Sequence, residues 1–189
     1  KSLKAQGSII IDASQQITNF VFTDGTGIQD NTYLLFGEEN NYKPVYSGAY
    51  NFGYSYMLDF GLFFRGTVGM RNAGATMVFD EVNYEWNFQY FTAKLGLGYS
   101  LNLGLANPYI GVSGYYGGLL KANQSINNEN FDIINSGSIM KRDLGLIVPL
   151  GVRIDASDFV SVFTEINYLV GLSNLEPEGN GQNAVNLAY

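Results

Sequence analysis

Apolar and polar residues alternate along much of this chain, with the period of β-strands. In the segment VSVFTEINYLVGL, residues 160–172, one set of alternate positions carries no charge, and the other set contains Glu165. Successive side chains of a strand point to opposite faces. The segment is therefore predicted to be a strand with one uncharged face and one mixed, polar face.

The same alternation recurs in segments spread along the whole chain. Besides 160–172, it is found in 2–12, 46–56, 60–71, 90–101, 109–121 and 143–155, and in a short segment at 184–189. Short connections near 58–59, 102–107 and 156–158 alternate with long polar segments near 13–44, 73–87, 122–138 and 174–184. No helical pattern competes with these eight candidate strands.

This layout predicts one domain, residues 1–189, that folds as an eight-stranded antiparallel up-and-down transmembrane β-barrel. The short connections would be periplasmic turns and the long ones extracellular loops, which places both termini on the periplasmic side. No run of 18 or more apolar residues exists, so a transmembrane helix is not expected.

Composition favours a lipid-facing surface. Charged residues make up 14% of the chain, well below the roughly 25% of an ordinary soluble domain, whereas aromatic residues reach 15%. A soluble lipocalin-like barrel that binds an apolar ligand remains an alternative, but its lumen has room only for its own packing or one small ligand. Aromatic girdles are expected at Tyr46, Tyr50, Tyr54, Tyr56 and Trp86.

The mixed faces carry the scattered charges of the strands. Glu165 is expected to point into the lumen and to meet basic residues of other strands, and the candidates are Lys4, Arg65, Arg71, Lys94, Lys121 and Arg153. A charge away from water must be paired and hydrogen-bonded. We expect this ion network to fill the lumen rather than to catalyse a reaction, so a general diffusion pore is not expected.

Two segments, PYIGVSGYYGGLLKA and FVSVFTEINYLVGLSNL, together with the rhythm of turns and loops, resemble a family of small outer-membrane β-barrels common in Bacteroidetes. These barrels are related in shape to those of OmpA and OmpX, and the family includes PorT-like secretion components, membrane anchors and adhesins. The resemblance covers nearly the whole chain. It implies a Gram-negative outer-membrane location with the signal peptide already removed, while the short last segment departs from the full closing strand of the family, so that the chain could be truncated or continue into the periplasm.

Catalytic and metal sites find little support in the residues. The chain has no histidine and no cysteine, and outer-membrane barrel enzymes resemble one another in using a histidine. We therefore expect no enzyme activity and no cofactor. Asp24, Asp30 and Asn31 in a glycine-rich segment form a weak calcium candidate, although their spacing matches no EF-hand. A net charge of −7 disfavours nucleic acid.

These features predict a non-enzymatic outer-membrane protein that serves as a scaffold, an anchor or a subunit of a cell-surface complex through acidic, aromatic loops. Its expected partners are outer-membrane lipid, lipopolysaccharide and other proteins of such a complex. A component of a secretion or transport machine is the first alternative, and the soluble barrel is the second.

Overall fold

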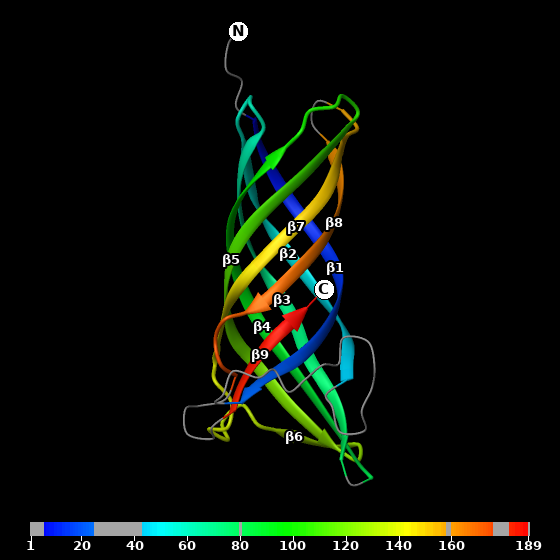
Figure 1. Cartoon of the computed structure of the whole chain (residues 1–189), viewed down its shortest axis with the longest axis vertical. Coiled ribbons are helices and arrows are strands. Elements are labelled where there is room, and N and C mark those ends of the chain that lie inside the picture. Colours follow the sequence, from blue (N-terminus) through cyan, green and yellow to red (C-terminus); the bar gives the residue numbers. More distant parts are fainter. Residues whose placement is uncertain (1–5, 25–42, 80, 158–159, 176–181, 189) are drawn as a thin grey trace.

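In the computed structural model the chain forms one antiparallel sheet that curls into an elongated barrel (Figure 1). The structure describes residues 6–24, 43–79, 81–157, 160–175 and 182–188. The strands are β1 (Gln6–Asp24), β2 (Lys43–Met57), β3 (Leu62–Phe79), β4 (Val82–Ser100), β5 (Ala106–Ile126), β6 (Glu129–Asp132), β7 (Arg142–Asp155), β8 (Ser161–Gly171) and β9 (Gln182–Ala188). No helix in this described part is long and apolar enough to cross a membrane.

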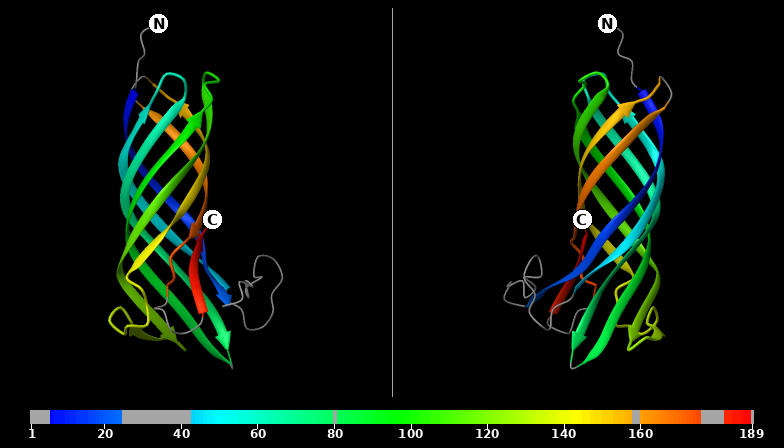
Figure 2. Two further views of the ribbon diagram at one scale, coloured as in Figure 1. Left: turned by 60° about the vertical axis from the view of Figure 1, so that its left-hand side comes forward. Right: turned by 90° about the vertical axis from the view of Figure 1, so that its right-hand side faces the viewer.

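Neighbours in the sequence are neighbours in the sheet, and the sheet closes on itself through β1 and β9. The wall consists of β1 to β5 and β7 to β9, while β6 forms a hairpin with the end of β5. The predicted eight-stranded up-and-down antiparallel barrel is therefore confirmed. Figure 2 shows the strong tilt of the strands around the barrel axis, which closure of a sheet requires.

One end of the barrel, which we call the turn end, has short connections at 58–61, 101–105 and 156–160. At Gly61 the backbone has φ 96°, and a Cβ there would lie 2.3 Å from the Ser100 carbonyl oxygen, so only glycine fits this turn. The opposite end, which we call the loop end, carries the connections from β1 to β2, from β5 to β7 and from β8 to β9.

Two of the predicted long loops are largely strand. The segment 73–87 is a hairpin, in which β3 and β4 pair as far as Phe79 and Val82. In the segment 122–138, β5 continues to Ile126 and turns back directly into β6. Both segments contain alternating apolar residues among their polar ones, and pairing with a long neighbour strand extends them beyond the roughly 9–11 residues that a bilayer requires.

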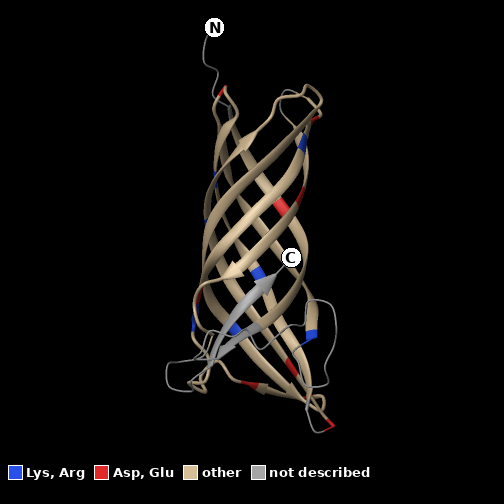
Figure 3. Cartoon of the chain, viewed as in Figure 1, with Lys and Arg blue, Asp and Glu red and all other residues tan. Residues whose placement is uncertain are grey.

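The uncharged faces of the strands point outward. The strands β1 to β5, β7 and β8 present large apolar residues there, for example Ile11, Phe52, Val68, Leu95, Val112, Val148 and Ile166. In the described segments 9–17, 46–56, 64–70, 91–99, 110–120, 144–150 and 162–168, the outward positions carry no charged side chain. Figure 3 shows how few acidic and basic residues interrupt the wall.

Inside the loop end of the barrel, the residues form an apolar cluster. Its buried members are Phe20, Ala73, Ala75, Phe88, Tyr90, Leu119, Ala122 and Leu175, and Trp86, Ile133, Ile134 and Ile139 pack against it. Phe20 stacks on Phe88 with ring centroids 5.4 Å apart. This cluster, which we call the apolar plug, occupies the lumen at the loop end.

Candidate functional site

The lumen holds a first ionic unit near the turn end. Arg65 on β3 donates from Nη1 to Glu165 Oε2 on β8, at 2.6 Å, and the hydroxyl of Tyr109 on β5 donates to the same oxygen at 2.7 Å. The Arg65 guanidinium also lies 5.4 Å from the ring centroids of both Phe63 and Tyr109. The unit therefore satisfies the carboxylate by hydrogen bonds and the cation by a carboxylate and aromatic faces.

A second unit of the same composition lies nearer the loop end. Arg71 on β3 donates to Asp143 Oδ2 on β7, and the Tyr115 hydroxyl donates to the same oxygen at 3.0 Å. The rings of Tyr90 and Tyr115 lie 5.4 and 5.1 Å from the guanidinium carbon. The side chains of Arg71 and Asp143 are only 1% and 0% exposed, so this pair is shielded from water.

The two units are a repeat along the same pair of strands. Arg65 and Arg71 are six residues apart on β3, and Tyr109 and Tyr115 are six residues apart on β5. An even spacing keeps both members of each pair on the inner face. The carboxylate comes from β8 in one unit and from β7 in the other.

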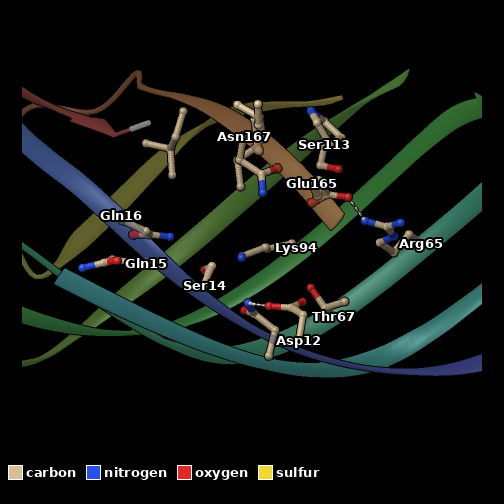
Figure 4. Close-up of a pocket in the computed structure, with 15 residues that line it drawn as sticks. Asp12, Ser14, Gln15, Gln16, Arg65, Thr67, Lys94, Ser113, Glu165 and Asn167 are labelled. Carbon is tan, nitrogen blue, oxygen red and sulfur yellow. Dashed lines mark hydrogen bonds and ion pairs between the residues drawn. The ribbon is translucent and has the colours of Figure 1, made fainter. Parts of the chain in front are cut away.

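A polar cavity of about 220 Å³ occupies the lumen between the two units. Figure 4 shows Lys94 reaching into this cavity, with Asp12, Gln16 and Asn167 around it. Asn51 donates from Nδ2 to Asp12 Oδ1 at 2.6 Å. The cavity thus has a mixed lining, in which charged and amide side chains face apolar residues such as Ile147 and Leu169.

Arg153 and Asp155 complete the charged lining at the turn end, with Nε and Oδ1 3.0 Å apart. The charged side chains that line the lumen in the described strands are Asp12, Arg65, Arg71, Lys94, Asp143, Arg153, Asp155 and Glu165. They comprise four acids and four bases, so the lumen is neutral although the chain has a net charge of −7.

The structure places five of the seven residues proposed for the ion network inside the barrel, namely Arg65, Arg71, Lys94, Arg153 and Glu165. Lys121 is exposed instead, because the register between β4 and β5 shifts at Gln89 and Tyr90 and reverses the alternation of β5. Lys4 lies outside the described residues.

Sequence reasoning did not assign site roles to Asp12, Tyr109, Tyr115 and Asp143. Asp12 and Asp143 fall on the mixed, polar faces of their strands, and Asp143 shares that face with Arg153. The alternation therefore places both acids on the inner face correctly. The alternation could not predict the partner of each residue, because ion pairs across the lumen join strands that are not neighbours in the sheet. The Arg71–Asp143 pair, for example, joins β3 and β7.

The interface aromatics divide into two groups. Tyr46, Tyr50, Tyr54 and Tyr56 all point outward and are 41–76% exposed. Trp86 does not join them, since it precedes the buried Phe88 by two positions and packs on the inner side, against the apolar plug. Its ring centroid lies 6.5 Å from that of Phe20 and 5.9 Å from that of Tyr84.

The calcium candidate falls mostly outside the described residues: Asp30 and Asn31 lie there, and Asp24 is the last residue of β1. In the part of the chain that the structure describes, no group of three or more acidic side chains could hold a metal ion. Glu165 and Asp143, which pair with Arg65 and Arg71 across the lumen, each also accept a hydrogen bond from a tyrosine hydroxyl. These carboxylates are consequently engaged in holding the wall together.

An apolar outer surface and a neutral, internally paired lumen define this fold as a transmembrane β-barrel. No protein-family model and no curated protein matches the chain. Among solved structures, the chain is similar to Neisserial surface protein A, with a TM-score of 0.45 and 11% identity over 94% of this chain and 95% of that one.

A second similar structure is Ail, the attachment invasion locus protein of Yersinia pestis, with a TM-score of 0.37 and 13% identity over 96% of this chain and 93% of that one. Ail in complex with the heparin analogue sucrose octasulfate gives a TM-score of 0.36 and 10% identity, again over 96% and 93% of the two chains. With all TM-scores below 0.5, the roles of these proteins do not transfer to the present chain.

Proposed function

We propose that this protein is a non-conducting, non-enzymatic barrel of the Gram-negative outer membrane, which serves as a scaffold or surface-complex subunit and presents its loop end to partners. The observation that carries the proposal is the contrast between the two surfaces of the wall. The outer surface is apolar and uncharged at membrane depth, while the inner surface is closed by paired charges and by the apolar plug.

The blocked lumen supports a scaffold rather than a channel. An ion that entered from the turn end would meet the Arg65 unit, and then the fully buried Arg71–Asp143 pair. Beyond these lies the apolar plug, where Phe88 and Tyr90 are 2% and 0% exposed. Desolvation of an ion at such a constriction is costly.

The loop end supplies the surface that a partner would contact. In the sequence, the strand ends and connections of this end contain eleven acids and four bases. Their difference is seven negative charges, the same as the net charge of −7 of the whole chain. The turn-end connections and the segment before β1 contain two acids and two bases. An acidic surface of this kind favours a basic protein surface, or divalent cations that bridge to lipopolysaccharide phosphates.

The proposal is tested with the purified 189-residue chain. We expect extraction only with detergent, heat-modifiable migration on gels, and no single-channel currents in planar bilayers. Recovery from the soluble fraction without detergent, with binding of a hydrophobic dye, would favour the soluble barrel. Stepwise conductance would favour a transport role.

The partner role has its own test. Cross-linking on intact cells, followed by mild detergent extraction, should recover loop-end complexes that dissociate as salt is raised, because surface charge pairs are screened. A matched chain with Glu81, Glu85 and Glu129 changed to Gln should lose these complexes while it keeps heat-modifiable migration. Unchanged recovery of partners by that variant would contradict an electrostatic loop-end interface.

A further inference from the structure

Three basic residues gather on one side of the loop end, where β5 lies beside β7. They are Lys121 on β5, Arg142 at the start of β7 and Lys141 directly before it, and all three are exposed. Gly118 of β5 pairs with Arg142, and the Leu119 amide donates to the Lys141 carbonyl at 2.9 Å. Along the strands, their backbones therefore lie within roughly 10 Å of one another, because a strand rises about 3.3 Å per residue. We call these three residues the basic cluster.

Two members of the basic cluster point away from the lumen. Lys121 pairs with Gln89 on β4, and both chain neighbours of Gln89 are buried on the inner side. Arg142 is followed by Asp143, whose side chain is fully buried in the lumen. Because side chains alternate along a strand, Lys121 and Arg142 face the medium around the barrel. Lys141 lies beside them, outside the strands.

Within the described residues, the basic cluster has no acidic partner of its own. The three ion pairs between described side chains lie inside the barrel or at its rim and include none of the three bases. The Lys141 amine donates to the neutral Asn135 Oδ1, at 3.3 Å. The carboxylate of Asp132, on β6 beyond Lys121, accepts the Ile134 amide at 3.0 Å instead. The cluster is thus a local positive surface at an end of the barrel that is otherwise rich in acids.

The outer wall next to the basic cluster, on its turn-end side, is apolar. Tyr116 and Leu144 pair with each other there and are each 46% exposed. A Cβ at Gly114 or Gly118 would meet no heavy atom within 4 Å, so these two outward positions lower the surface between larger side chains. The cluster therefore borders a shallow apolar hollow rather than a further polar surface.

A positive surface that borders an apolar hollow fits a ligand with an anionic head and an apolar tail. Arginine binds phosphate through two parallel N–H groups, and lysine adds a positive charge beside it. A soluble acidic protein would leave the hollow uncovered, whereas a phosphorylated lipid covers both parts. The acids elsewhere at the loop end repel the same headgroup, which directs it to this side of the barrel.

We propose that the basic cluster binds the phosphate groups of a phosphorylated glycolipid of the outer leaflet, with an acyl chain of that lipid over Gly114 and Gly118. The inference rests on the proposed function, which places the barrel in the outer membrane with its loop end outward. The acyl chains hold the lipid beside the wall, so the three bases act on a headgroup that is already at the membrane surface, where basic residues attract anionic lipid.

Titration of fluorescent lipopolysaccharide in neutral-detergent micelles, read by anisotropy, tests the proposal on the folded 189-residue chain. Arg142→Gln and Lys43→Gln form a matched pair, because each removes one positive charge from the loop end, but Lys43 lies on β2, three strands from β5. We expect about 5-fold weaker binding for Arg142→Gln and less than about 2-fold for Lys43→Gln. The variant in which Lys121, Lys141 and Arg142 are all changed to Gln should bind about 100-fold more weakly. Asp132→Asn removes a nearby negative charge and should tighten binding.

Ligand controls separate the possible anions. Dephosphorylated lipopolysaccharide and phosphatidylglycerol should each bind at least about 10-fold more weakly than intact lipopolysaccharide, because they present fewer phosphate charges to the three bases. Inorganic phosphate should not compete, since it cannot cover the hollow, and added salt should weaken the binding of intact lipopolysaccharide. Equal binding of either lipid control, or displacement by inorganic phosphate, overturns the assignment to a phosphorylated glycolipid.

Heat-modifiable migration shows that each variant is a folded barrel. The proposal is overturned if the folded triple variant binds lipopolysaccharide as tightly as the unsubstituted chain, or if Lys43→Gln weakens binding as much as Arg142→Gln. The two single variants decide the question if the triple variant does not fold. Recovery of the unsubstituted chain without detergent would instead contradict the proposed function, so the two failures are distinguishable.

Discussion

At the scale of single residues, the lumen is organised by arginines that have two kinds of partner. Each inner guanidinium of β3 contacts one carboxylate and at least two aromatic rings. Arginine suits this role because its planar charge is weakly hydrated and stacks on rings. The tyrosine hydroxyl donates a second hydrogen bond to the same carboxylate oxygen, so each carboxylate is held by an arginine and a tyrosine.

The buried Arg71–Asp143 pair should be the most sensitive point of the lumen. Asp143→Asn leaves a charge at Arg71 without its counter-ion, and we expect it to lower the free energy of unfolding by about 3–5 kcal/mol. Asp155→Asn at the rim is the matched control and should cost less than about 1 kcal/mol, since the Asp155 side chain is 40% exposed. Urea unfolding in phospholipid vesicles, followed by the fluorescence of the single tryptophan, measures both.

Thr18 offers a second test at this scale. Its hydroxyl accepts from the Gly74 amide at 3.0 Å and donates to the Gly74 carbonyl at 3.1 Å, where the pairing of β2 with β3 is interrupted between Pro44 and Ala49. Thr18→Val keeps the shape of the side chain but leaves the amide and the carbonyl of Gly74 without this hydrogen-bond partner, and should lower the free energy of unfolding by about 1–3 kcal/mol. Thr164→Val, on the outer face, should be neutral or stabilising in the same unfolding assay.

At the scale of elements, the alternation of residues predicted each strand but not how far it extends. The sequence pattern predicts a long polar loop at 73–87, although this segment forms the ends of β3 and β4. The ends of β3 and β4 nevertheless pair with each other, and β4 also pairs with β5. Pairing with a neighbouring strand, rather than the intrinsic β-propensity of the residues, therefore determines where these strands end. The prediction of an inner position for Lys121 was wrong for a similar reason, since the sequence does not reveal where the register of β4 and β5 shifts.

The hairpin between β5 and β6 has a turn that can be improved. Ile126 pairs with Glu129, and the two residues between them, Asn127 and Asn128, have φ 48° and 69°. Two-residue turns with positive φ at both positions favour Asn-Gly. Asn128→Gly should therefore raise the free energy of unfolding by about 0.5 kcal/mol, whereas Asn128→Val should lower it by about 1–2 kcal/mol because a β-branched residue is strained there. A result of the opposite sign in vesicle unfolding would contradict this description of the turn.

At the scale of the whole molecule, the sequence was sufficient for the class of fold because each strand repeats the same two-faced pattern. The site could be predicted only in part. Glu165 and the arginines were expected in the lumen, yet the assignment of partners depends on barrel closure, which brings β3 opposite β7 and β8.

The orientation of the wall can be tested by charge insertion. Leu95→Arg places a charge among the exposed apolar side chains of the outer face, where Leu95 is 76% exposed, and should lower the free energy of unfolding in vesicles by about 2–4 kcal/mol. Leu103→Arg, in a turn and 70% exposed, should cost at most about 1 kcal/mol. Equal, small effects of the two substitutions would mean that the outer face around Leu95 faces water.

The repeated arginine–carboxylate–tyrosine units have a consequence for assembly. A single ion pair across the lumen fixes one point of contact, about which the two strands could still rotate. Two ion pairs on β3, six residues apart and formed with different strands, fix both the position and the direction of β3 across the lumen. A slip of β3 by one residue would turn both arginines to the apolar outer face at once. A misaligned register therefore loses two ion pairs rather than one, which favours the native register.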